Sequence, residues 1–170
     1  DAARLSTLGV PSDRIAVLGD SRFDSVVDRI RAVRANDPLL RFGAGAPTLV
    51  AGSTWAGDED VLLDAFSRLH VHRPEARLIV VPHEPTPAHL ERLESEARKL
   101  GLPAPVRLSA ASAPAPLLIV DRVGVLAALY GAAMSAWAGG GYDRAGPHPG
   151  TPPPPRGLPR PLAPALARRP

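Results

Sequence analysis

The chain contains no cysteine, only 4% aromatic residues and a single methionine. Without cysteine it can form neither disulfide bonds nor thiolate metal sites, and we expect no metal site of another kind. No apolar run approaches the roughly 20 residues of a membrane-spanning helix, and the N-terminus lacks a signal-peptide pattern. We therefore expect the chain itself to be soluble.

Charge and motifs exclude further classes of protein. The arginines behind the net charge of +3 are scattered among acidic residues instead of forming one block. This distribution argues against a nucleic-acid partner. The sequence has neither a P-loop lysine pattern nor a G-x-S-x-G elbow, so it supports neither nucleotide hydrolysis nor a serine hydrolase.

Four short apolar runs are each followed by a loop of small or polar residues. Runs without polar alternation are typical of strands in a parallel sheet that is covered on both faces. Helical patterns lie between them, so the sequence predicts a doubly wound α/β layer. Ligands of such sheets bind outside the carboxyl ends of the strands, where these loops would lie. The runs are Thr48–Val50, Leu78–Val81, Leu117–Val120 and Met134–Ala138.

Further elements follow from periodicity and end signals. Gly101 is a natural C-terminal cap, and Asp58 is a fair N-cap for the helix that begins near it. An additional strand is expected at Ile15–Gly19. Helices are expected at Ala2–Leu8, Ser25–Ala35, His89–Leu100 and Val123–Ala133, and from Asp58 to about Leu69.

The two ends differ from the middle. The chain begins at Asp1 without an initiator methionine, so we expect a fragment of a larger protein. Residues 147–170 hold 10 of the 21 prolines, and proline disfavours both helices and central strands. We expect one domain over residues 1–146 and an extended or disordered tail over residues 147–170.

Taken singly, the loops leave their role open. Gly52, Ser53 and Thr54 could bind a phosphate or carboxylate through backbone amides and hydroxyls, or form an ordinary strand-to-helix turn. His83 beside Glu84 could be a ligand-binding or acid–base pair, or part of a rigid exposed loop. The glycines at 139–141 could admit a ligand to the backbone or simply turn the chain.

Taken in order, the loops resemble a family, the 3-deoxy-D-manno-octulosonic acid (Kdo) transferases. Five blocks match its motifs in order and spacing, and together they cover nearly everything before the tail. They are the opening from Gly9 to Asp24, Ala51–Glu59 (for ASTHEGEE), Leu78–Pro85 (for LI.VPRHPE), Asp121–Gly131 (for DT.GEL..LYG), and Trp137–Gly141 with Gly146 and His148 (for FVGGS and GGHNPLEP).

The resemblance implies a glycosyltransferase B fold, in which two Rossmann-like domains face a cleft. Such enzymes transfer Kdo from CMP-Kdo to lipid A precursor in lipopolysaccharide biosynthesis, at the cytoplasmic face of the bacterial inner membrane. This chain would be the C-terminal, donor-binding half. The acceptor-binding domain, the membrane contact and the carboxylate general base would lie upstream of Asp1, so we expect no catalytic residue here and no catalysis by the fragment alone. No cofactor is implied beyond the substrate CMP-Kdo.

Donor-binding roles carry over onto nine positions, all as implications of the resemblance. Ser53 and Thr54 would face the sugar nucleotide, and Pro82 and His83 the cytidine phosphate. The phosphate and base would lie by the helix start at Gly124 and Val125. The donor pocket would be lined by Gly140, Gly141 and His148.

Three positions depart from the family pattern. His83 replaces an arginine, so a permanent bidentate phosphate clamp becomes a group that is only partly cationic near neutral pH. Val125 and Pro152 replace glutamates that would organise donor hydroxyls.

Two alternatives remain at the level of sequence. Another glycosyltransferase-B-type enzyme that uses a UDP-sugar would share the architecture but prefer uridine nucleotides. A non-catalytic, truncated nucleotide-binding module would retain only the scaffold, and nucleotides would not raise its melting temperature.

Overall fold

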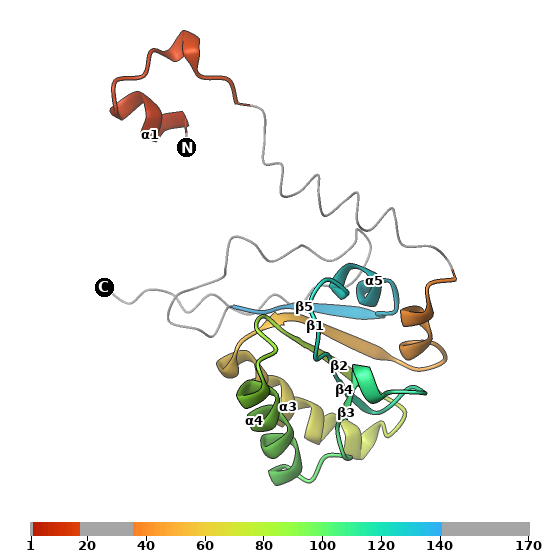
Figure 1. Cartoon of the computed structure of the whole chain (residues 1–170). Coiled ribbons are helices and arrows are strands. Elements are labelled where there is room, and N and C mark those ends of the chain that lie inside the picture. Colours follow the sequence, from red (N-terminus) through yellow and green to blue (C-terminus); the bar gives the residue numbers. More distant parts are fainter. Residues whose placement is uncertain (1, 18–35, 141–170) are drawn as a thin grey trace.

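The structure, a computed structural model, describes residues 2–17 and 36–140. Its core is a parallel α/β sheet with helices on both faces (Figure 1). The predicted helix Ser25–Ala35 and the predicted tail of residues 147–170 lie outside the described residues. In chain order the elements are α1 (Ala2–Thr7), η1 (Ser12–Arg14), η2 (Pro38–Phe42), β1 (Thr48–Thr54), α3 (Ala56–His72), β2 (Arg77–Pro82), α4 (Pro87–Lys99), β3 (Val106–Arg107), η3 (Leu108–Ala110), β4 (Leu117–Ile119), α5 (Leu126–Gly131) and β5 (Ser135–Ala138).

The sheet has the strand order β3-β4-β2-β1-β5, and every described pair of neighbours is parallel. At its centre Val50 of β1 lies opposite Ile79 of β2 on one side and Ala136 of β5 on the other. Each of the four apolar runs forms a strand of this sheet. The predicted doubly wound parallel α/β fold is confirmed.

Successive residues of the strands point to opposite faces, so both faces are packed. Ala51 belongs to the cluster beneath α3 and α4, which includes Leu63 and Leu93. Val50 belongs to the cluster on the other face, where Leu129 of α5 and Phe42 of η2 pack. Figure 1 shows the same division, with α3 and α4 together on one side of the strands and α5 on the other.

Helix α4 has well-defined ends. The Thr86 hydroxyl accepts from the His89 N–H at 3.3 Å, and Pro87 occupies the first turn, so the helix begins two residues before the predicted start. At the other end Gly101 has φ +68°, and the Leu102 N–H donates to the Ala97 carbonyl. This is a Schellman motif, as expected for a helix that ends at glycine.

Helix α3 begins differently from the prediction. Its N-cap is Trp55, and Asp58 is the third helical residue, where its carboxylate accepts from the Trp55 N–H at 3.0 Å. The predicted N-cap role of Asp58 is therefore wrong. The reason is that a carboxylate at this position can return to the N-cap backbone, which is half of a capping box.

The predicted loop Ala51–Thr54 is also wrong, because β1 continues through Thr54. Its small residues reflect close packing and not a turn. A Cβ on Gly52 would lie 2.3 Å from the Tyr130 hydroxyl and 2.7 Å from a methyl group of Leu126. The strand register is irregular between Gly52 and Thr54, and Ser53 there has φ +53°.

One predicted strand does not form in the residues described, and one predicted helix is shorter than expected. Ile15, Ala16 and Val17 form no strand, and the rest of that prediction, residues 18 and 19, lies outside the described residues. No described strand pairs with this stretch, and the Val17 side chain is 80% exposed. The N–H and C=O groups of an extended segment there would therefore have no partner strand among the described residues. Helix α5 begins only at Leu126, because Gly124 has φ +87° and cannot be helical.

Candidate ligand-binding edge

The carboxyl ends of β1, β2, β4 and β5 lie along one edge of the parallel sheet. The chain leaves β2 toward α4 on one face and leaves β4 toward α5 on the opposite face. Neighbouring strands whose exits diverge in this way create the crevice in which α/β proteins bind ligands. The candidate site therefore lies at the loops that follow these strands.

Backbone contacts hold the ends of β1 and β5 together. The Gly139 N–H donates to the Gly52 carbonyl at 2.9 Å. A Cβ on Gly139 would lie 2.4 Å from the Ser53 carbonyl oxygen, so only glycine allows this approach. The next residue, Gly140, has φ +94° and is buried. Ser53 and Gly140, both predicted site residues, are thus brought to neighbouring positions.

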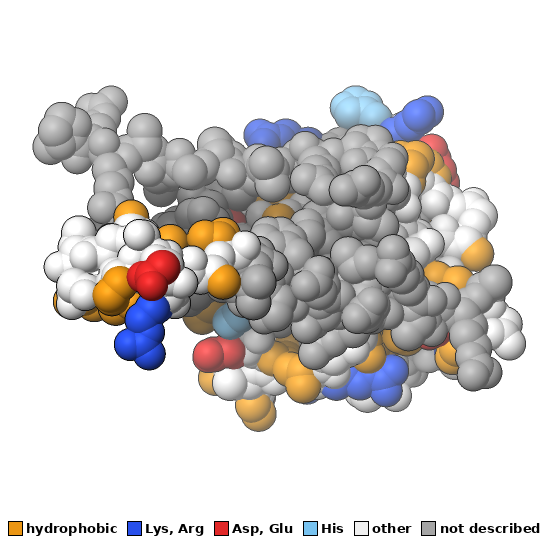
Figure 2. Space-filling model, turned by 90° about the horizontal axis from the view of Figure 1, so that it is seen from above, with side chains coloured by type: hydrophobic (Ala, Val, Ile, Leu, Met, Phe, Trp, Pro, Cys, Tyr) orange, Lys and Arg blue, Asp and Glu red, His pale blue; other side chains and the backbone are white. Residues whose placement is uncertain are grey.

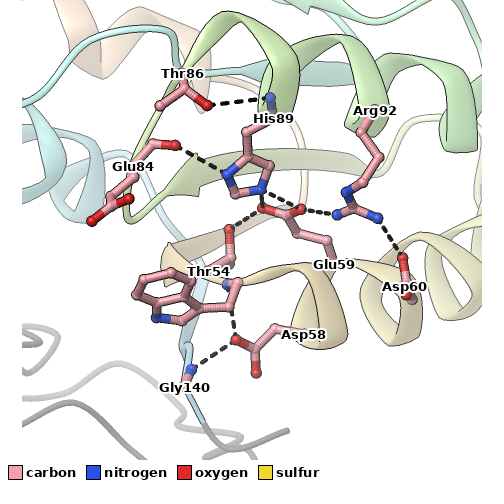
Figure 3. Close-up of polar contacts among 10 residues, drawn as sticks. Thr54, Asp58, Glu59, Asp60, Glu84, Thr86, His89, Arg92 and Gly140 are labelled. Atoms are coloured by element: carbon pink, nitrogen blue, oxygen red, sulfur yellow. Dashed lines mark hydrogen bonds and ion pairs between the residues drawn. The ribbon is translucent and has the colours of Figure 1, made fainter. Parts of the chain in front are cut away.

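Asp58 joins the same two loops through its side chain. Its carboxylate is fully buried, and one oxygen accepts from the N–H groups of Trp55 at 3.0 Å and Gly140 at 2.7 Å (Figure 3). Hydrogen bonds to an ionised, buried acceptor are among the stronger polar contacts in proteins. Asp58 therefore fixes the end of β5 against the start of α3.

Glu59, the next residue, is equally buried and points toward α4 (Figure 3). Its carboxylate accepts from the Thr54 hydroxyl at 2.9 Å, contacts Nε2 of His89 at 2.8 Å, and pairs with Arg92. Two consecutive carboxylates at the start of α3 thus reach two different neighbouring elements. Asp58 holds the end of β5, and Glu59 holds the first turns of α4.

His89 continues the network into the loop between β2 and α4. Its Nδ1 lies 3.0 Å from the Glu84 carbonyl oxygen, while Nε2 faces both oxygens of Glu59. Both ring nitrogens face acceptors, so the imidazolium form, with a proton on each nitrogen, satisfies both contacts.

Arg92 closes the network on the solvent side by pairing with Asp60 at 2.9 Å as well as with Glu59. Burial lowers the pKa of the Arg92 guanidinium, but its hydrogen bonds and charge interactions with Asp60 and Glu59 outweigh burial and raise the pKa above its usual value. The arginine therefore remains charged and balances Glu59.

His83 lies between the ends of β1 and β2. Its backbone N–H donates to the Thr54 carbonyl at 2.9 Å, and its ring stacks on that of Trp55, with centroids 4.8 Å apart and planes 28° apart. The preceding Pro82 is buried as the last residue of β2. The loop after β2 is thus held against the loop after β1 by both backbone and side chain.

The loop after β4 carries Gly124, which is exposed, and Val125, which packs partly buried against the core beside α5. The Asp121 carboxylate at the start of this loop accepts from the Ser109 N–H at 3.1 Å. This contact joins the loop to the short helix η3 next to β3.

Seven of the nine predicted site residues are described, and all seven follow or end strands at the one edge. Gly141 and His148 lie outside the described residues. Thr54 is turned inward, because its hydroxyl donates to Glu59. Sequence reasoning missed the roles of Glu59, His89 and Arg92. The one signal for them was the pair of adjacent acidic residues at the start of α3.

The described part of the chain offers no other kind of site among metal centres, membrane spans and basic patches on the face of Figure 2. There no three His, Asp or Glu side chains are arranged to hold a metal ion. Within residues 2–17 and 36–140, no helix is long and apolar enough to cross a membrane. On the face seen in Figure 2, the described lysines and arginines occur in separate places and not as one continuous patch.

Sequence comparison finds relatives among glycosyltransferases. The chain is 26% identical over 156 residues to a bifunctional glycosyltransferase/methyltransferase of Fusobacterium nucleatum, with 87% of this chain and 23% of that protein covered. It is 25% identical over 158 residues to the 3-deoxy-D-manno-octulosonic acid transferase of Haemophilus influenzae, with 85% of this chain and 34% of that protein covered. The chain thus spans about a quarter to a third of these relatives' lengths. No family model matches it.

A solved structure has the same fold. It is the C-terminal CMP-Kdo binding domain of WaaA from Acinetobacter baumannii, which matches with a TM-score of 0.55 at 18% identity and covers 74% of this chain and 61% of that one. This likeness agrees with the Rossmann-like, glycosyltransferase B assignment of the fold. In sequence, over most of its length, the chain resembles the Kdo transferases, as its motifs predicted.

Proposed function

We propose that this chain is the CMP-Kdo-binding part of a Kdo transferase, an enzyme that transfers Kdo from CMP-Kdo to lipid A precursor in lipopolysaccharide biosynthesis. The proposal is supported by a relative that carries this name and by a neighbour in structure described as a CMP-Kdo binding domain. Parts of the enzyme outside this sequence would bind the acceptor and supply the general base. The reaction would take place at the cytoplasmic face of the bacterial inner membrane.

One observation carries the proposal, namely that Ser53 near the end of β1 and the loops carrying His83, Gly124 and Gly140 lie along one edge of a single sheet. The exposed Gly124 leaves the backbone open to close approach, which suits an anionic phosphate. A sugar nucleotide is an elongated anion, and a crevice that several loops line can contact its base, phosphate and sugar together.

Individual roles follow from how each side chain is directed. Because the Thr54 hydroxyl is engaged by Glu59, Ser53 is the residue of this pair that we expect to contact the donor. His83 would contact the phosphate from the loop after β2, and Gly124 and Val125 would line the opposite wall after β4. Gly140, whose N–H is held by Asp58, would line the donor pocket together with Gly141 and His148, which lie outside the described residues.

The donor should bind only weakly to the chain by itself. His83 stands where the family has an arginine, whose guanidinium can donate two hydrogen bonds to a phosphate, and histidine is a weaker phosphate ligand. Val125 stands where the family has a glutamate, so it provides no carboxylate for the donor hydroxyls. A cleft formed with a second domain would add the remaining contacts. We therefore expect no transfer activity from the isolated chain.

Calorimetric titration of the 170-residue chain with CMP, and separately with UMP, tests the proposal. We expect weak but saturable binding of CMP, weaker binding of UMP, and an upward shift of the melting temperature with CMP. A preference for UMP would indicate a UDP-sugar enzyme. No binding and no shift with either nucleotide would indicate a non-catalytic module, and both results contradict the proposal.

A further inference from the structure

We infer that Glu59 is a positioning residue, which through His89 fixes the loop that carries His83 at the ligand-binding edge. The inference deepens the proposed function and rests on it where the donor phosphate is concerned. Glu59 itself is buried beneath the edge and would not touch the donor.

The first step is the direction of the contacts. From Glu59 the network runs to Nε2 of His89 at 2.8 Å, and from Nδ1 of the same ring to the Glu84 carbonyl at 3.0 Å (Figure 3). Glu84 is the residue directly after His83. One imidazole ring therefore connects a buried carboxylate to the backbone of the loop after β2.

The second step is that Glu59 cannot move to follow the loop. It accepts from Thr54 at the end of β1 and pairs with Arg92 of α4, and its side chain is completely buried. A carboxylate with this many partners is held in one place, since losing them would leave a buried charge unsatisfied. Glu59 is thus a fixed point for the loop.

The third step is that the loop position decides where the His83 ring lies. His83 is held on one side by its backbone bond to Thr54 and by stacking on Trp55. On its other side the Glu84 carbonyl is held by His89. Without the Glu59–His89 contact, that second restraint is lost and the ring can leave the Trp55 face.

Fluorescence of Trp55 reports this position without any ligand. The substitution Trp137→Phe leaves Trp55 as the one tryptophan of the chain. The His83 ring stacks on the indole of Trp55, so it should shield Trp55 from a neutral collisional quencher such as acrylamide. His83→Ala should increase quenching by acrylamide and so measures the shielding.

In that background, Glu59→Gln keeps the size of the side chain and removes its charge. We expect acrylamide to quench Trp55 nearly as strongly as in His83→Ala, and CMP affinity to fall about tenfold, as for one charge-assisted hydrogen bond. The matched control is Glu94→Gln. Glu94 pairs with Arg107 at 2.5 Å in a mostly shielded carboxylate–arginine contact that joins α4 to β3 and not to the loop after β2, so its loss should change neither reading.

His89→Gln is the second variant, in case Glu59→Gln does not fold. His89 is 15% exposed, and glutamine can still donate to Glu59 but has no second nitrogen for the Glu84 carbonyl. It should lose the shielding of Trp55 as well. Full shielding of Trp55 in either folded variant, equal to that in Glu94→Gln, would overturn the inference. If the parent chain binds no CMP, the proposed function fails, while the fluorescence still decides whether Glu59 positions the loop.

Discussion

The Gly140 N–H donates a hydrogen bond of 2.7 Å to the carboxylate of Asp58, a residue 82 positions earlier in the chain. Because Asp58 also accepts from Trp55, one buried carboxylate sets the spacing between the loop after β1 and the loop after β5. Predicted donor-binding residues lie on both sides of this contact, Ser53 and Thr54 at the end of β1 and Gly140 after β5, so the shape of the edge depends on it.

Replacing Asp58 with alanine should destabilise the fold by about 2 kcal/mol, because two N–H groups lose a charged acceptor at a buried site. Asp58→Asn should cost less, since the remaining carbonyl can still accept. Urea unfolding of both variants measures the difference. Asp64→Asn is the control, because Asp64 forms an exposed pair with Arg68 one turn away and should cost well under 1 kcal/mol. Equal losses in Asp58→Ala and Asp64→Asn would contradict the role of Asp58.

Gly139→Ala should be strongly destabilising. The added Cβ would meet the Ser53 carbonyl oxygen at 2.4 Å and the Thr54 Cα at 2.7 Å, and backbone atoms cannot yield as a side chain can. We expect a loss of about 1–3 kcal/mol, typical of overpacking, together with weaker CMP binding. In Gly131→Ala the new Cβ meets only a terminal methyl of Leu40, at 2.9 Å, so this matched variant should be nearly neutral. Thermal melts of the two variants compare them directly.

Tyr130 predicts how stability changes at alkaline pH. Burial raises the pKa of its phenol far above the ordinary value of about 10. The folded state therefore favours the neutral phenol, and the stability from this preference is complete below about pH 10 and is lost as the pH rises further. Tyr130→Phe removes the titrating group. We expect the variant to lose less stability than the parent between about pH 9 and about pH 11.5 in urea unfolding.

The same substitution has an expected outcome at neutral pH. The Tyr130 hydroxyl is buried, and no partner for it is found in residues 2–17 and 36–140. Removing a buried hydroxyl of this kind should be neutral or stabilise by about 1 kcal/mol. A marked loss of stability at pH 7 would show that the hydroxyl has a partner after all.

His83→Arg should strengthen nucleotide binding if the proposed function holds. Arginine stays charged and can contact a phosphate through two N–H groups, whereas histidine is cationic only in part near neutral pH. We expect CMP affinity to rise about tenfold at about pH 8. Calorimetric titration of the variant and the parent at this pH gives the comparison, and a variant no tighter than the parent would count against phosphate contact at this position.

The fold could be predicted because its signals are local. An apolar run such as Leu78–Val81 has no polar face to give to solvent, which indicates a covered parallel strand, and Gly101 marks the end of α4 within one residue. Strand β3 was missed because Val106–Arg107 is only two residues long and follows two prolines. So short a strand forms through its pairing with Leu118 and Ile119, and no local pattern announces it.

The candidate edge could be predicted only in part. The loops after β2, β4 and β5 could be located because each follows a strand, but the contacts between loops involve residues far apart in sequence. Glu59 and His89 are 30 positions apart, and nothing near either residue indicates the other. Gly52 was misinterpreted for a related reason. Small residues occur both in turns and at positions where a neighbouring side chain packs closely against the backbone, and only the packed structure distinguishes the two cases.

Gly52 and Tyr130 complement each other in size, one leaving the volume that the other fills. Neither position can therefore be varied independently in protein engineering. A larger residue at 52 would be tolerated only with a smaller one at 130 or 126, so redesign of the edge must treat the end of β1 and helix α5 as a single mutational unit.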